Sequence, residues 1–157
     1  MARLKVFSVH FVNSLSVLVG GGKEAVMAEG VKQNGPLPTV VLMGLAEGLA
    51  EELGRVLAQE GYTVCLGPLL PRDLALRLID QAEAGVVFCP AEREHCAPLL
   101  EAMKAEKPGL PVVAVSRLPE VSSWLNALEL GAADYCAPPF EPAQIQWILQ
   151  SALKPAA

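Results

Sequence analysis

Residues 111–153 read PVVAVSRLPEVSSWLNALELGAADYCAPPFEPAQIQWILQSAL, and this stretch decides the fold. PVVAVS (111–116) is a nearly continuous apolar run, as is typical of a parallel strand covered on both faces. A helical pattern follows, then a short strand at ADYCA (133–137), and Glu141-Pro142 opens a closing helix. The order strand, helix, strand, helix predicts an α/β architecture.

The same alternation extends back to Thr39. Further strands are predicted at TVVLMG (39–44), YTVCL (62–66) and GVVFC (85–89), with a helical pattern after each. Five such repeats predict one doubly wound α/β domain with a single five-stranded parallel sheet. The apolar residues expected to face the core include Leu49, Leu53, Val56 and Leu57 in the first helix, Leu74, Leu78 and Ile79 in the second, Leu99, Leu100 and Met103 in the third, Leu125 and Leu128 with Ala132 in the fourth, and Ile145, Ile148, Leu149 and Ala152 in the fifth.

This pattern resembles the response-regulator receiver domain, of the flavodoxin-like or CheY-like type. In receivers a Ser or Thr ends the fourth strand, an A-L-x-x-G-A-x-x-Y run follows, and a Lys-Pro-Phe step precedes the last helix. Ser116, Tyr135, Pro139 and Phe140 stand in those places. The resemblance covers about residues 39–154 and implies the strand order 2-1-3-4-5.

The chain departs from receivers where phosphorylation takes place. The resemblance places Gly44 and Leu45 where receivers have two Mg²⁺-binding acids, and Pro90 where they have the phosphorylated aspartate. Pro138 replaces the lysine that assists phosphoryl transfer. Only the hydroxyl of Ser116 survives, so we predict a degenerate pocket, a pseudo-receiver with no catalytic residue, metal or other cofactor.

Three carboxylates near these positions could in principle rebuild a metal site. They are Glu47, Glu92 and Glu94. We interpret Glu47 as a helix-starting residue and the other two as solvated loop residues.

Two pairs of residues are candidates for signalling. In receivers, the hydroxyl and the aromatic at Ser116 and Tyr135 form a coupled switch, so these two are either switch residues or packing relics. Trp147 lies among glutamines on the last helix, which is typical of an interface anchor. Trp124 is a second interface candidate, although its spacing to Leu128 also fits the core.

A histidine and three cysteines could be drawn as a soft-metal or redox cluster. They are His95, Cys96, Cys89 and Cys136, but their spacing matches no zinc pattern. A nucleophilic Cys89 or Cys96 with His95 as base is also disfavoured, because adjacent helical residues point about 100° apart.

The composition of the chain argues against several classes of protein. The net charge is −5 and the 12 Lys and Arg residues are scattered, which argues against direct nucleic-acid binding. No apolar run approaches the roughly 20 residues that span a bilayer. Four cysteines without a C-x-x-C pair favour reduced thiols, and we expect a cytoplasmic protein without a membrane partner.

Residues 1–38 lie outside the resemblance and predict an appendage, a possible β-hairpin followed by a linker; 39–157 form the receiver-like domain. The chain ends soon after the last helix, so we expect a stand-alone module.

Taken together, the sequence predicts a phosphorylation-independent interaction module in a two-component phosphorelay setting. The resemblance implies a histidine kinase, another regulator or a second copy as partner, with a homodimer formed through the fourth and fifth helices. The alternative is a small-molecule sensor that binds a ligand in the emptied apolar rim, at Gly44, Leu45, Pro90 and Pro138.

Overall fold

The computed structural model describes residues 37–153. The predicted appendage therefore lies outside the described residues, apart from Leu37 and Pro38. The strands are β2 (Thr39–Met43), β3 (Thr63–Gly67), β4 (Ala84–Pro90), β5 (Val112–Val115) and β6 (Asp134–Cys136). The helices are α2 (Glu47–Gln59), α3 (Arg72–Ala82), α4 (Arg93–Glu106), α5 (Val121–Glu129) and α6 (Pro142–Leu153).

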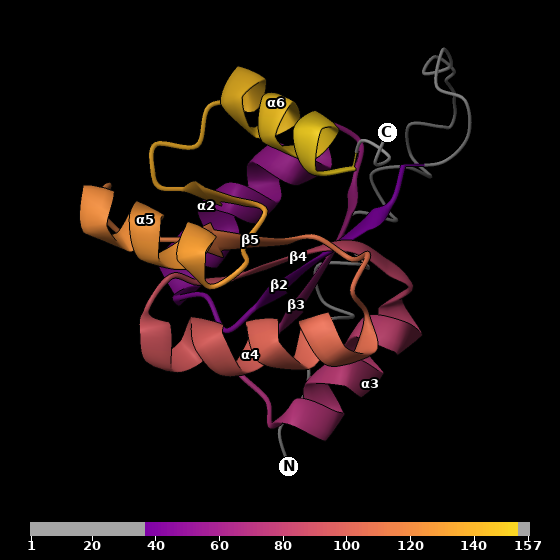
Figure 1. The fold of residues 1–157 in the computed structure, drawn as a ribbon. Helices are drawn as coiled ribbons and strands as arrows, with labels where there is room; N and C mark the ends of the chain where they lie inside the picture. The colour runs from indigo at the N-terminus through magenta and orange to yellow at the C-terminus, as the bar shows by residue number, and fades with distance from the viewer. Residues whose placement is uncertain (1–36, 154–157) are drawn as a thin grey trace.

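The five strands form one parallel sheet in the order β3-β2-β4-β5-β6. Counted within the domain, this is the predicted order 2-1-3-4-5, which is therefore confirmed. All five strands end at the same edge of the sheet because they run parallel. In Figure 1 the helices lie on both sides of the sheet, with α2 and α6 above it and α3 and α4 below it.

Each face of the sheet has its own apolar core, which explains why the strands are apolar at successive positions. On the face covered by α3, α4 and α5 the buried residues include Val41, Met43, Val87, Cys89, Leu78, Ile79, Leu99, Leu100, Met103 and Ala127. On the face covered by α2 and α6 they include Val40, Leu42, Phe88, Val113, Leu53, Leu57, Ile145, Ile148 and Leu149. The core predictions for the first, third and fifth helices are thus largely confirmed.

Helix α5 faces the sheet with a different side from the one predicted. Leu125 and Leu128 are exposed, whereas Ala127 is completely buried. The positions turned inward are Ser123, Ala127 and the C-cap residue Leu130, which follow helical spacing. At 100° per residue, the apolar stripe of α5 lies roughly 100° around the helix axis from Ala127. The prediction was wrong for Leu125 and Leu128 because the stripe does not mark the buried side of α5, whereas the predicted burial of Ala132 is confirmed.

Leu74 on α3 is a second correction. Its side chain is 46% exposed, and the neighbouring Ala75 packs into the core instead. Ala75 lies at the spacing of Leu78 and Ile79, so the buried stripe of α3 begins one residue later than predicted.

Candidate functional site

The loops after β2, β4, β5 and β6 meet at the carboxyl edge of the sheet, where ligands bind in open α/β folds. Gly44 and Leu45 follow β2, Pro90 ends β4, Ser116 follows β5 and Pro138 lies two residues beyond β6. The parallel topology therefore brings the predicted pocket residues to one rim.

Backbone hydrogen bonds connect the neighbouring strands and loops of this rim. The amide of Gly44 donates to the Gly67 carbonyl at 2.8 Å, and that of Ser116 donates to the Cys136 carbonyl at 3.0 Å. Between them, the amide of Ala91 donates to the Val115 carbonyl at 2.8 Å. These three N–H groups are engaged by neighbouring strands, so in this conformation they are not directed at a bound anion.

A leucine lies against the position where the resemblance expects the first acid. Gly44 has φ +75°, a left-handed conformation that glycine adopts without strain. A Cβ at this position would lie 2.4 Å from Cγ of Leu69, from the loop after β3. Backbone conformation and Leu69 together oppose any side chain at position 44, which sequence reasoning did not foresee.

The other pocket positions also lack ionisable groups. Pro90 is buried, and Leu45 and Pro138 are half-buried. Glu47, Glu92 and Glu94 are all exposed. Within residues 37–153, no three His, Cys, Asp or Glu side chains gather in a way that could hold a metal ion.

Ser116 and Tyr135 converge on a single acceptor. The Ser116 hydroxyl donates to the Leu118 carbonyl at 2.7 Å, and the Tyr135 hydroxyl donates to the same carbonyl at 3.3 Å. The Tyr135 oxygen also accepts a hydrogen bond from the amide of Glu120 at 3.1 Å. Glu120 is the N-cap residue of α5, so the two side chains fix the loop that leads into this helix.

An exposed apolar stripe runs along α5. It consists of Val121, Trp124, Leu125 and Leu128, with Trp124 43% and Leu125 49% exposed. These positions follow the i, i+3, i+4, i+7 spacing of one helix side. A row of exposed apolar side chains along one helix side is a candidate interaction surface.

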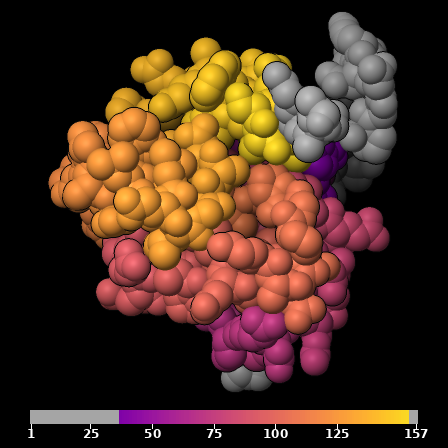
Figure 2. Space-filling model, in the orientation of Figure 1, coloured from indigo at the N-terminus to yellow at the C-terminus, as the bar shows by residue number. Residues whose placement is uncertain are grey.

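Trp147 extends from α6 and is 63% exposed, so it contributes little to the core. Helices α5 and α6 precede and follow the edge strand β6, and Figure 2 shows both segments on the same side of the molecule, in orange and yellow. Sequence reasoning found both tryptophans but missed Val121 and assigned the two leucines of α5 to the core.

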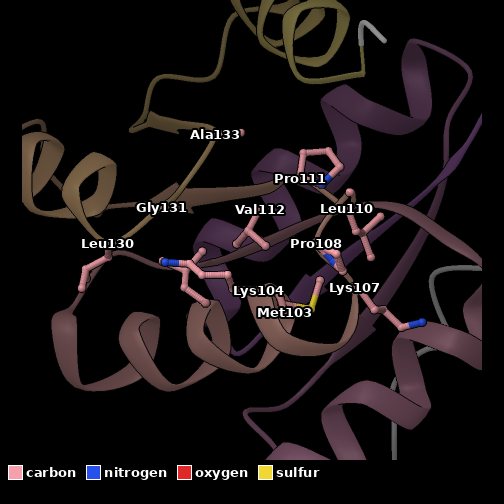
Figure 3. A pocket seen from close by; sticks show the side chains of 12 residues that line it. Met103, Lys104, Lys107, Pro108, Leu110, Pro111, Val112, Leu130, Gly131 and Ala133 are labelled. Carbon is pink, nitrogen blue, oxygen red and sulfur yellow. The ribbon is translucent and has the colours of Figure 1, made fainter. Parts of the chain in front are cut away.

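Two cavities lie beside α4. One, of about 310 Å³, opens between the ends of α4 and α5 and the start of β5 (Figure 3). There Lys104 extends toward Leu130 and Gly131, while Lys107 forms an ion pair with Asp80 on α3.

The second cavity, of about 220 Å³, lies between α3 and α4 and includes Met43 and Leu69 in its lining. Neither cavity is lined by Gly44, Leu45, Pro90 or Pro138. These cavities give no support to a ligand in the predicted rim.

The four cysteines are buried. Burial raises the pKa of the Cys136 thiol to about 12, with a smaller contribution from the charge of Asp134. Burial also raises the pKa of Cys65. Cys136 lies on the α2 and α6 face and Cys89 on the other, so the disfavoured cluster of cysteines with His95 cannot include both.

Among the described residues, no helix is both long and apolar enough to cross a bilayer. No protein-family model matches the chain, and no curated protein matches its sequence.

Solved structures do share the fold. A CheY-like protein, TadZ, from Pseudomonas aeruginosa is similar with a TM-score of 0.65 at 22% identity, over 74% of this chain and 99% of that one. A putative response regulator from Chloroflexus aurantiacus gives 0.63 at 23% identity, over 76% of this chain and 100% of the other. NtrX from Brucella abortus gives 0.64 at 23% identity over 74% of this chain, which spans only 26% of the NtrX chain.

A further similar structure is the beryllofluoride-activated NtrC4 receiver domain, described as a dimer. It has a TM-score of 0.63 and 18% identity, over 75% of this chain and 98% of that one. The likeness to these proteins establishes the receiver fold of this chain.

Proposed function

We propose that this receiver-fold chain is a non-enzymatic interaction module of two-component signalling that works without phosphorylation. Its docking surface, the α5 face, consists of Leu118, Val121, Trp124, Leu125 and Leu128. Trp147 on α6 is its second element. The observation that carries the proposal is the outward orientation of large apolar side chains on α5, while the small Ala127 meets the sheet.

The absence of phosphorylation is inferred from side-chain chemistry at the rim. Phosphoryl transfer to a receiver needs an acceptor carboxylate and a metal ion held by oxygen ligands. Gly44, Leu45 and Pro90 offer neither, and Leu69 occupies the space beside Gly44. The signal must therefore reach the α5 face by another route, such as the concentration of a binding partner.

The partner that we propose is a second copy of the chain. A helix stripe with i, i+3, i+4, i+7 spacing can pack against its own copy about a two-fold axis, which is the commonest symmetry of homodimers. Leu125 lies near the middle of the stripe and Trp124 beside it, and aromatic anchors of this kind dominate binding energy. The NtrC4 receiver dimer provides a precedent within the shared fold.

Sedimentation velocity over a concentration series tests this proposal. We expect a monomer–dimer equilibrium that Leu125→Glu shifts at least about tenfold toward monomer, because a buried charge at an interface is strongly unfavourable. Leu74→Glu is the matched control, since Leu74 is 46% exposed but lies on α3. Trp147→Ala tests the contribution of α6.

Two results would oppose the proposal. One is a wild-type chain that remains monomeric at high concentration. The other is an equal loss of association in Leu74→Glu and Leu125→Glu, since this would place the contact outside the α5 face.

A further inference from the structure

Cys89 and Cys96 form a close pair beneath the rim. Their Sγ atoms lie 4.0 Å apart, with Cys89 as donor and Cys96 as acceptor. Cys89 is next to the end of β4 and Cys96 lies in the first turn of α4, so the pair joins two elements across the loop that contains Pro90. Both side chains are completely buried on the same face of the sheet.

The remaining cysteines are positioned away from this pair. Cys65 on β3 is in register with Val41 on β2, which pairs with Val87 on β4. Two strand spacings therefore separate Cys65 from β4, about 10 Å. Cys136 lies on the opposite face, so the fold selects one pair of its four thiols.

The two thiols of the pair differ in acidity. Cys96 has a lowered pKa because it accepts the hydrogen bond from Cys89, and this outweighs the effect of burial. Cys89 has a pKa well above its usual value because it donates that hydrogen bond and is buried. Cys96 is therefore the better nucleophile, since the thiolate is the reactive form.

We propose that Cys89 and Cys96 are a redox-sensitive pair that forms an intramolecular disulfide by exchange with a low-molecular-weight disulfide. The Cys96 thiolate attacks one sulfur of the small disulfide, whose S–S bond breaks and releases one thiol. Cys89 then gives up its proton and attacks Sγ of Cys96, which releases the second thiol. The pair loses two electrons and two protons, and one small disulfide becomes two thiols.

The new bond would connect β4 to α4 across the loop formed by Ala91 and Glu92. Bond formation requires the two sulfurs to approach from 4.0 Å to about 2.05 Å. Because both thiols are buried, exchange must proceed through an opening of the first turn of α4. We therefore expect slow formation of the disulfide and slow reduction by small thiols.

The test is a redox titration of the whole chain with reduced and oxidised glutathione. After equilibration, free thiols are blocked with N-ethylmaleimide, and mass spectrometry of peptides identifies the linked residues. The same titration in urea supplies the reference, because Cys89 and Cys96 are also the nearest cysteines along the unfolded chain. We expect a Cys89–Cys96 disulfide whose equilibrium constant is at least about tenfold larger in the folded chain, or about 30 mV in potential.

An equilibrium constant in the folded chain equal to or below that in urea would overturn the proposal, as would glutathione adducts without the linkage. Cys65→Ala should retain the linkage, and Cys89→Ala should abolish it. The comparison of folded and unfolded wild-type chains needs no variant, so a poorly folding variant does not affect the outcome.

Discussion

The outward orientation of the apolar side of α5 predicts losses of stability of different size for two neighbouring substitutions. Leu125 is 49% exposed, and complete burial of a leucine contributes about 1.5–3 kcal/mol. Leu125→Ala should therefore lower the free energy of unfolding by about 1 kcal/mol or less. Ala127 is 0% exposed, and a larger side chain in a packed core costs about 1–3 kcal/mol, so Ala127→Leu should be the more destabilising change.

Urea unfolding followed by circular dichroism at 222 nm measures both effects by linear extrapolation. The protein concentration must keep the chain monomeric, since dimerisation would add apparent stability to the wild type. In thermal unfolding, each kcal/mol corresponds to a midpoint change of roughly 2–4 °C for a chain of this size. A loss above 2 kcal/mol in Leu125→Ala, together with tolerance of Ala127→Leu, would refute the observed orientation of α5.

Three further substitutions or conditions give defined outcomes. Gly44→Asp should lower the unfolding free energy in urea by about 1–3 kcal/mol, because φ is positive there and Leu69 lies against the new side chain; an unchanged midpoint would contradict this. Tyr135→Phe should cost about 1 kcal/mol in thermal unfolding, since it removes the hydrogen bond to the Leu118 carbonyl and the one from the Glu120 amide, and an unaltered stability would show that these bonds contribute nothing. Cys136 should make the free energy of unfolding fall as the pH rises from about 9 toward 12. The unfolded thiol releases its proton near its ordinary pKa of 9.0, whereas the folded thiol keeps its proton until its pKa of about 12. This difference gives a slope of up to about 1.4 kcal/mol per pH unit. Urea unfolding at pH 8 and pH 10 checks this, and Cys136→Ala should have the shallower pH dependence.

Much of the fold could be predicted because the burial of the strands follows directly from their runs of apolar residues. Runs such as TVVLM at β2 are apolar at almost every position, which is typical of a sheet covered on both faces. The strand order was a different kind of prediction, since it came from the receiver resemblance. The structure now gives that order independently.

The orientation of α5 could not be predicted for a physical reason. Val121, Trp124, Leu125 and Leu128 share one helix side whether that side packs on a sheet or on a partner. The deciding residue is Ala127, whose small side chain carries no strong hydrophobic signal. Periodicity therefore identifies the stripe but not what covers it.

The candidate site also has features that could be predicted from the sequence and features that could not. Residue identity shows that Gly44 and Pro90 carry no carboxylate, and the resemblance to receivers is what singled out these two positions. The packing of Leu69 against Gly44 depends on the conformation of the loop after β3, which local sequence does not determine. The shared acceptor of Ser116 and Tyr135 is a backbone carbonyl, and its position depends on a turn rather than on residue type.

The proposed independence from phosphorylation is tested most directly by thermal unfolding with and without Mg²⁺ and beryllofluoride, the aspartyl-phosphate mimic. A ligand at 100 times its dissociation constant adds about 2.7 kcal/mol, which would raise the midpoint of this domain by roughly 5–10 °C. The proposal predicts no Mg²⁺-dependent shift. A clear Mg²⁺-dependent rise would mean that carboxylates such as Glu47, Glu92 or Glu94 rebuild the pocket, and the central claim would be wrong.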